Sequence, residues 1–147
     1  MTLSIRNAMP KDRESCMALL HSLASFTGGF TNPLASTTFN RLLDNARGEI
    51  LVAEEDGNIL GMASVSYNLA MRYGGEYCQL EELIVDPAGR GKNVGGKLVE
   101  KTIERAKLRG CAEYGLYLIE TTEQNLPFYE KYGFKKVGSE LRQSLKN

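Results

Sequence analysis

The chain is 147 residues long, the size of one ordinary domain, and we expect a single domain over residues 1–147. Hydrophobic residues make up 42% of it and charged residues 24%, a mixture that excludes disordered and collagen-like proteins. Eighteen Lys and Arg residues balance eighteen Asp and Glu residues, so the overall charge predicts neither a nucleic-acid-binding protein nor one held to an anionic membrane.

The first half of the chain predicts a strand, two helices and then a β-hairpin. Apolar and polar residues alternate near the N-terminus as in a strand, and from Pro10 onward the apolar residues recur at helical spacing. Glycines then end this predicted helix, and a second helix is predicted after them. Asp56-Gly57 then separates two alternating segments, which is a strong hairpin signal. These predicted elements span residues 3–7, 10–24, 36–46, 50–53 and 59–65.

The second half of the chain predicts strands that alternate with helices. A third alternating run ends at Asp86-Pro87, and the amphipathic helix that follows stops at Gly110. A strand, a short helix and a segment able to form two more short strands complete the chain. The predicted ranges are 77–85, 95–109, 114–119, 125–132 and 135–145. This order indicates an α/β (α+β) fold, in which helices cover a mixed central sheet.

The turn between the third run and its helix is rich in glycine. Residues 89–96 read Gly-Arg-Gly-Lys-Asn-Val-Gly-Gly and lead directly into the helix. Glycines let backbone N–H groups converge on a ligand, and a helix N-terminus carries about half a positive charge, so this turn is suited to phosphate. Residues 90–109 contain seven basic residues and two acidic ones, and we therefore expect a polyphosphorylated ligand.

Two other phosphate-binding motifs match this turn only in part. The P-loop motif requires Ser or Thr to bind Mg²⁺ where this chain has Leu98, which disfavours a metal-dependent NTPase. The dinucleotide-binding fingerprint meets Val94 where its third glycine belongs. A simple strand-to-helix turn with solvated lysines remains the non-functional alternative.

The composition also bears on location and on metals. The N-terminal residues lack the apolar stretch of a secretory signal, and no apolar run approaches the roughly 20 residues that span a bilayer, so we expect a cytoplasmic protein. Three widely separated cysteines form neither a disulfide framework nor a Cys-x-x-Cys site, and His21 is the only histidine. The sequence therefore predicts no metal site.

Two motifs resemble those of the GCN5-related N-acetyltransferase superfamily. Residues Arg90-Gly91-Lys92-Asn93-Val94-Gly95 resemble its Arg/Gln-x-x-Gly-x-Gly/Ala motif, with Asn93 in place of the first glycine. Because Asn tolerates positive φ better than most residues, we expect the loop to keep its shape. Residues 128–134 resemble the family's C-terminal Phe-Tyr-x-x-x-Gly-Phe motif. The Asn-Val-Gly variant is also similar to aminoalkylphosphonate acetyltransferases within the family.

The resemblance implies a mostly antiparallel sheet that is splayed between its fourth and fifth strands. It also implies acetyl-CoA as donor, coenzyme A as product, no metal in the chemistry, and direct transfer to a primary amine of a small molecule in a ternary complex. An N–H of Ile84 or its neighbour would polarise the thioester carbonyl, and Asn125 would stand in for a family Asn whose place Thr122 takes. The implied cofactor-binding residues are Leu83, Ile84, Val85, Arg90, Gly91, Lys92, Asn93, Val94, Gly95, Gly96, Asn125 and Tyr129.

Three residues are candidates for the proton transfers that such a reaction needs. An ammonium group must lose a proton before it attacks, and the departing thiolate must gain one. Glu81 and Glu82 are neighbours on a strand and are expected to face opposite sides; the resemblance favours Glu81 as the base, and a β-bulge would exchange the two. The resemblance implies that Tyr129 protonates the thiolate, with Tyr132 second.

The acceptor amine is expected to enter between the loop 25–33 and the segment 67–76. Arg72 would suit an acceptor that carries an anion. A non-catalytic acetyl-CoA-binding regulatory module and a protein or peptide N-acetyltransferase stay open as alternatives. A homodimer is expected from the family alone, in which dimers are common. The candidate substrate-binding residues are Phe26, Phe30, Arg72 and Tyr73.

Overall fold

The computed structural model describes residues 2–146 except 27–30, and describes residues 25 and 26 without their side chains. The chain forms two compact units, Met1–Leu116 and Tyr117–Asn147. The N-terminal unit contains, in order, β1 (Ser4–Asn7), the 3-10 turn η1 (Pro10–Asp12), α1 (Arg13–Phe26), α2 (Ala35–Leu42), β2 (Gly48–Glu55), β3 (Asn58–Ala70), η2 (Met71–Tyr73), β4 (Gly75–Val85), η3 (Pro87–Gly89), α3 (Val94–Arg109) and β5 (Tyr114–Leu116).

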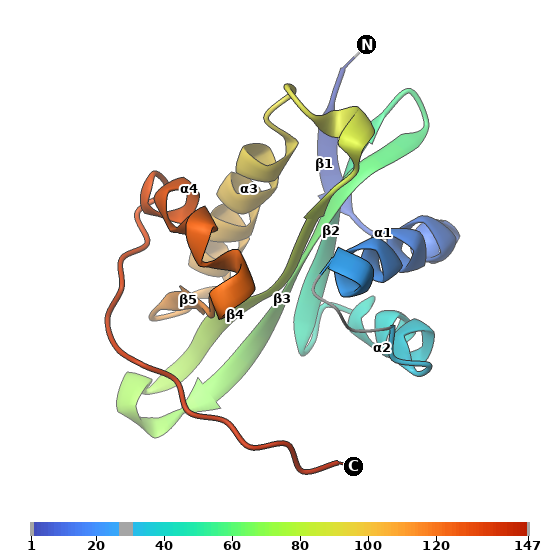
Figure 1. Cartoon of the computed structure of the whole chain (residues 1–147). Coiled ribbons are helices and arrows are strands. Elements are labelled where there is room, and N and C mark those ends of the chain that lie inside the picture. The colour runs from blue at the N-terminus through green and yellow to red at the C-terminus, as the bar shows by residue number, and fades with distance from the viewer. Residues whose placement is uncertain (1, 27–30, 147) are drawn as a thin grey trace. The chain divides into compact units, whose positions relative to one another are not determined.

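The five strands form one mixed sheet in the order β1-β2-β3-β4-β5 (Figure 1). The first three pairings are antiparallel and the last, β4 with β5, is parallel, which confirms the predicted fold class. The pairing of β4 with β5 covers only Cys78–Leu80 of β4. Among the described strands, the part of β4 from Glu82 to Val85 therefore pairs with β3 alone, and its other edge is open.

Local sequence explains where the main elements begin and end. Both residues of the predicted hairpin turn have positive φ, 52° at Asp56 and 81° at Gly57, as a tight turn between two strands requires. Gly110 ends α3 with a φ of 86°. At the start of the first helical segment, Asp12 accepts the N–H of Met9 at 2.7 Å and pairs with Arg6 at 2.7 Å, which joins the helix start to β1.

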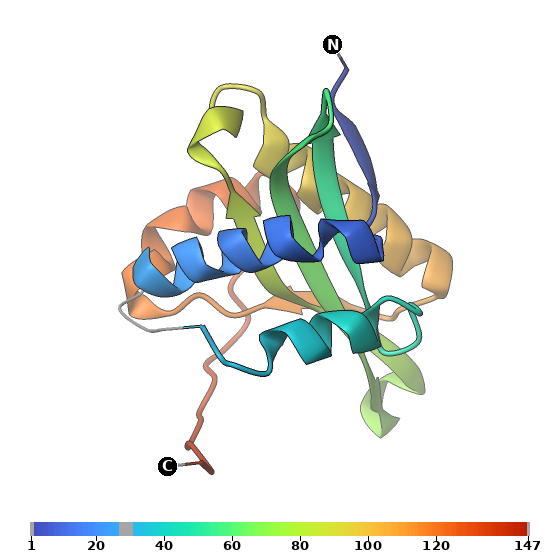
Figure 2. The same cartoon turned by 90° about the vertical axis from the view of Figure 1, so that its right-hand side faces the viewer.

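Helices cover both faces of the sheet (Figures 1 and 2). α1 and α2 pack on one face, where the buried core consists of Cys16, Leu19, Phe39, Ile50, Val52, Met62 and Ile84. α3 packs on the opposite face and buries Val94, Leu98 and Val99. A Cβ on Gly61 would lie 2.8 Å from Val94 Cγ1 and 2.9 Å from the carbonyl oxygen of Ile84, so this glycine permits the close packing of α3 on β3.

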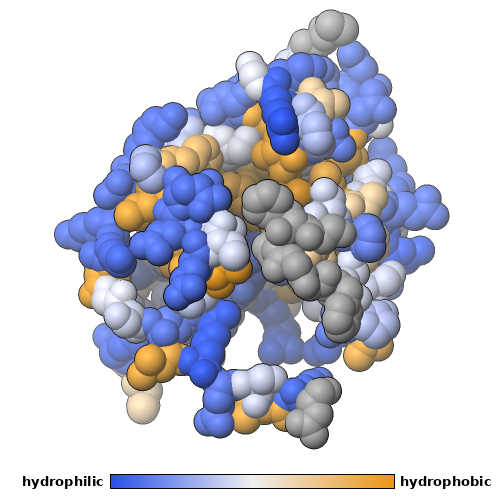
Figure 3. Space-filling model, in the orientation of Figure 1, coloured by the Kyte–Doolittle hydropathy of each residue, from blue (hydrophilic) through white to orange (hydrophobic). Residues whose placement is uncertain are grey.

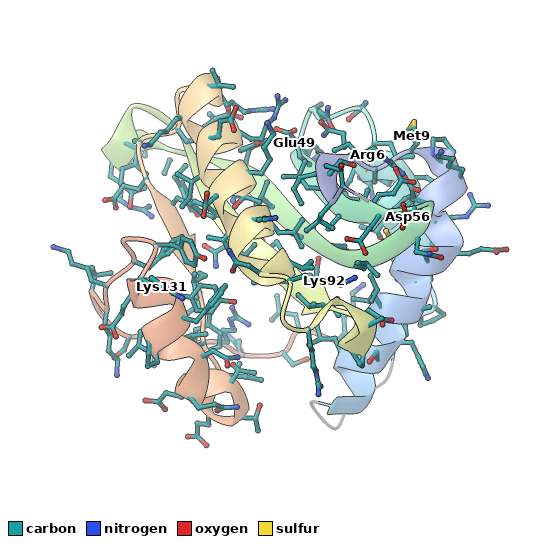
Figure 4. All side chains as sticks on the ribbon, turned by 90° about the horizontal axis from the view of Figure 1, so that it is seen from above. Arg6, Met9, Glu49, Asp56, Lys92 and Lys131 are labelled. Carbon is teal, nitrogen blue, oxygen red and sulfur yellow. The ribbon has the colours of Figure 1, made fainter. Side chains whose placement is uncertain are left out.

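A buried carboxylate joins α3 to the sheet on that face. Glu49 of β2 is only 3% exposed and lies beside α3 (Figure 4). It accepts hydrogen bonds from Tyr67 Oη, from Asn7 Nδ2 at 3.0 Å and from Arg105 Nε at 2.9 Å. Burial by itself would raise the pKa of this carboxyl, but the three donors outweigh it and hold the pKa below its ordinary value. Glu49 is therefore ionised and satisfied in the folded protein.

The C-terminal unit contains the 3-10 segment η4 (Glu120–Asn125) and the short helix α4 (Leu126–Glu130). The prediction of two short strands within residues 135–145 was wrong, because residues 134–146 form neither helix nor strand. Alternation by itself does not make a strand, which also needs a hydrogen-bonded neighbour. The apolar residues of this segment are largely exposed, namely Val137, Leu141 and Leu145.

Figure 3 shows hydrophilic residues over most of one face, with smaller apolar areas between them. Among the described residues, no helix combines the length and the apolar character that a bilayer crossing requires.

Candidate functional site

The glycine-rich turn after β4 has an unusual backbone. Pro87 ends the strand, and Asp86 Oδ1 accepts the N–H of Ala88 at 2.8 Å to fix the first part of the turn. Gly91 then has a φ of 80° and Asn93 a φ of 56°, both in the left-handed region. The expectation that Asn93 adopts the positive φ of a motif glycine is therefore confirmed, and the chain enters α3 directly from it.

This turn presents unpaired donors at the start of α3. The first bond of the helical ladder is donated by the N–H of Lys97 to the carbonyl oxygen of Asn93, at 3.0 Å. The N–H groups of Val94, Gly95 and Gly96 precede this bond and have no partner within the helix. With the helix dipole, they form a site whose chemistry fits a phosphate or diphosphate.

Fewer unpaired positive charges surround the turn than the count of basic residues in the sequence indicates. Among the seven basic residues of 90–109, the tertiary structure pairs four with carboxylates: Lys92 with Glu55, Lys101 with Glu104, Arg105 with Glu49 and Arg109 with Glu76. Figure 4 shows the Lys92 side chain beside the strands, and its Nζ lies 2.6 Å from Glu55 Oε1. Of the basic residues near the turn, Arg90 and Lys97 make no ion pair with the described residues, so they are the cations available to an anion.

The conformation of Asn93 leads to a stability prediction. Its side chain makes no capping hydrogen bond, so its contribution lies in the backbone conformation that it accepts. We expect Asn93→Val to lower the free energy of unfolding by about 1–2 kcal/mol, because a β-branched residue is strained at positive φ. Asn93→Gly should change it by less than about 0.5 kcal/mol. Urea denaturation of the three proteins measures both values, and equal losses in the two variants would contradict the explanation.

The open edge of β4 lies just before this turn. The N–H of Asp86 donates to the carbonyl oxygen of Leu60 at 2.8 Å. Bonded and non-bonded pairs alternate in an antiparallel ladder, so Ile84 bonds across to β3 while the N–H groups of Leu83 and Val85 point to the open edge. The expected donor was Ile84 or its neighbour, and by this register the neighbours Leu83 and Val85 are the available donors.

A β-bulge changes the positions of the two adjacent carboxylates. Ser64 of β3 is opposite Glu82, whereas Val65 is opposite Leu80, so Glu81 is the extra residue in β4. The expectation that Glu81 and Glu82 face opposite sides is therefore wrong. Ser64 Oγ donates to Glu82 Oε1, and Ser66 Oγ donates to Glu81 Oε2 at 2.6 Å. Both carboxylates lie on the face of the sheet that α1 and α2 cover.

The environments of these two carboxylates differ. Glu81 is exposed, whereas Glu82 is half-buried. Burial raises the pKa of the Glu82 carboxyl above its ordinary value, the hydrogen bond from Ser64 lowers it, and the negative charge of Glu81 raises it further, with a net increase. Sequence reasoning missed Ser64 and Ser66, because single serines on a strand give no signal until the register of β3 and β4 is known.

The candidate acceptor-binding residues that the structure describes lie apart from these two carboxylates. Arg72 and Tyr73 are in η2, at the far end of the β3–β4 hairpin, and the Arg72 guanidinium lies 4.6 Å from the centre of the Tyr73 ring. Tyr77, which Arg72 also contacts, is five residues before Glu82, or roughly 16 Å along the strand. The structure does not bring Arg72 to the carboxylates. Phe30 and the side chain of Phe26 lie outside the described residues.

The remaining candidates belong to the C-terminal unit. Tyr129 lies in α4 and is 9% exposed, with its ring 5.0 Å from that of Phe128 and 6.1 Å from that of Phe134. Burial raises the pKa of its phenol, so the hydroxyl keeps its proton at neutral pH. Asn125, the last residue of η4, is exposed.

The chain is similar to known proteins over most of its length. The family model described as "Acetyltransferase (GNAT) family" matches residues 17–134. A glucosamine 6-phosphate N-acetyltransferase of Trypanosoma brucei brucei is 28% identical over 149 residues, which cover 97% of this chain and 96% of that protein. The crystal structure of a transcriptional regulator from Bacillus halodurans C-125 has a TM-score of 0.86 and 27% identity, and covers 98% of this chain and 100% of its own.

One similar structure was determined with a ligand. The crystal structure of a predicted acetyltransferase with acetyl-CoA from Clostridium acetobutylicum has a TM-score of 0.81 and covers 98% of this chain and 97% of its own. Because its identity is 20%, this likeness shows the fold alone.

Proposed function

The chain belongs to the GNAT family of acetyltransferases, and from this premise we propose that it transfers the acetyl group of acetyl-CoA directly to a primary amine of a small molecule. The single observation that carries the proposal is the backbone of residues 89–96. Two residues at positive φ and the first N–H groups of α3 follow one another there, and the open edge of β4 lies just before them in the chain.

The donor would bind mainly to backbone groups. The N–H groups of Val94, Gly95 and Gly96 would hold the diphosphate, and Arg90 and Lys97 would supply positive charge beside it. The open edge of β4 would bind the pantetheine amides as a sheet edge binds a peptide. There the N–H of Leu83 or Val85 would donate to the thioester carbonyl. Bound acetyl-CoA supplies the activated acetyl group.

Glu82 is the general base that the geometry favours over Glu81. A general base must be ionised before the reaction and basic enough to accept a proton near neutral pH. A carboxyl group with a raised pKa suits this task. Glu82 combines partial burial with a raised pKa, whereas Glu81 is exposed. Glu82 would remove a proton from the acceptor's ammonium group and so release the amine for attack.

Tyr129 would return a proton to the departing thiolate. The resemblance of residues 128–134 to the family's C-terminal motif supports this role. The raised pKa of the buried phenol supports it as well, because the hydroxyl is then protonated and able to donate at working pH. Asn125, which belongs to the C-terminal unit like Tyr129, would contact the cofactor.

The acceptor is proposed as a small primary amine, with amino-sugar phosphates as the first class to test. The reason is the Trypanosoma relative, which is named for glucosamine 6-phosphate and matches this chain over nearly its whole length. A non-catalytic acetyl-CoA-binding regulator remains the second candidate, because the similar Bacillus protein is described as a transcriptional regulator. The two candidates share the donor site and differ in turnover.

Two measurements test the proposal. Calorimetry with acetyl-CoA should detect binding, and its absence would overturn both candidates. Release of free thiol should then occur with at least one amine from a panel of amino-sugar phosphates, amino acids, aminophosphonates and polyamines. Binding without thiol release would favour the regulator. In the same assay, Tyr129→Phe should slow thiol release by about 10-fold or more and leave acetyl-CoA binding unchanged, and equal losses of both would remove its role as the acid.

A further inference from the structure

Ser64 is a buried serine directly opposite Glu82 in the pairing of β3 with β4. It is 3% exposed, in the middle of β3, and the hydrophobic residues Ile50 and Met62 adjoin it on the same face. A buried hydroxyl is costly unless it is hydrogen-bonded, and the bond that Ser64 donates goes to Glu82 Oε1. The register makes the two residues direct cross-strand partners, so this bond is built into the pairing of β3 with β4.

The bond also determines which oxygen of Glu82 is presented. In the described part of the chain, every buried side-chain oxygen and nitrogen atom has a hydrogen-bond partner. The bond from Ser64 is made to Oε1, and no bond to Oε2 occurs in that part. Ser64 therefore anchors one oxygen inside the sheet and leaves Oε2 without a partner among the described residues.

The charges around Glu82 are few. Among the described residues, Glu81 is the only charged group that acts on the Glu82 carboxyl. From β2 and α2, Ile50 and Phe39 complete the same core, and α1 contributes Cys16, whose pKa burial raises to about 12. The charged or titratable residues Arg13, Glu14 and His21 of α1 and Arg41 of α2 are exposed. Among the described residues, Ser64 is thus the one neutral donor that favours the ionised form of Glu82.

We propose that Ser64 is a positioning residue for acetyl transfer: its buried hydroxyl holds Glu82 Oε1 so that Oε2 is aimed at the acceptor amine. The inference rests on the proposed role of Glu82 as the base. It assigns to β3 a part in the chemistry that the two sequence motifs do not contain.

The test compares Ser64→Ala with the wild type by two independent readouts on the full chain. In the pH profile of kcat/KM, the ascending limb should move to higher pH by about one unit, because the ionised carboxylate loses a charge-assisted hydrogen bond. The pKa of the Glu82 side chain, measured by carbon NMR during a pH titration, should rise by the same amount. Ser64→Thr keeps the hydroxyl and should restore both values.

A matched control separates positioning from general damage. Thr102→Val also removes a buried hydroxyl, on α3 at the opposite face, where it donates to the carbonyl oxygen of Val99 and accepts from Tyr114 Oη. This variant should lose stability without a shift in either readout. If the NMR pKa of Glu82 does not move in Ser64→Ala, the inference is overturned. If it moves while the rate profile does not follow it, Glu82 is not the base, and the proposed mechanism fails instead.

Discussion

Glu82→Gln should lower kcat/KM by about 10²- to 10³-fold, while the affinity for acetyl-CoA stays within about 2-fold of the wild type. Gln has nearly the same size as Glu and can still accept the bond from Ser64, so the change removes the base with little change in packing. Calorimetry gives the donor affinity, and thiol release at saturating donor gives the rate. A similar loss in both quantities would show that Glu82 is structural.

The neighbouring carboxylate is the matched control for this variant. Glu81→Gln should change kcat/KM at the pH optimum by less than about 10-fold, because Glu81 is the exposed member of the pair. Its negative charge raises the pKa of Glu82, so its removal should shift the ascending limb of the pH profile to lower pH. A larger loss in Glu81→Gln than in Glu82→Gln would reverse the assignment and make Glu81 the base, as the family resemblance suggested.

The largest loss of stability is expected for Glu49→Ala. The change removes the acceptor of Tyr67, Asn7 and Arg105 together and leaves their donors without that partner. We expect the free energy of unfolding to fall by about 2–4 kcal/mol, less than the full cost of breaking a buried ion pair because Arg105 is 35% exposed. Urea denaturation at pH 7 measures the difference.

An exposed ion pair within α3, the helix that carries Arg105, serves as the control for Glu49. Glu104 pairs with Lys101 at 3.2 Å and is 56% exposed, so Glu104→Ala should cost less than about 0.5 kcal/mol. The folded pKa of Glu49 lies below its unfolded value, so its stabilisation is complete above about pH 4.3 and is lost as pH falls through the folded value. The difference between wild type and Glu49→Ala should therefore shrink in acid, and a constant difference would contradict the assigned ionisation.

The two motifs and most elements could be predicted because they depend on consecutive residues. The Asp56-Gly57 hairpin and the turn through Asn93 follow from local φ preferences, and α3 follows from its apolar spacing. The C-terminal strands could not be predicted in this way. Residues 135–145 have the local alternation, but pairing with another strand decides whether such a segment becomes part of a sheet.

By itself, the sequence determined the class of fold, the tight turn of residues 89–96 that leads into α3, and the list of ionisable candidates. Only the tertiary structure decided which of those candidates act together. The local excess of positive charge in 90–109 falls because carboxylates from β2 and β4 reach α3 and the turn before it. Glu81 and Glu82 share a face because the register of β3 and β4 contains a bulge. Charge pairing and strand register join residues that are distant along the chain, so no local pattern specifies them.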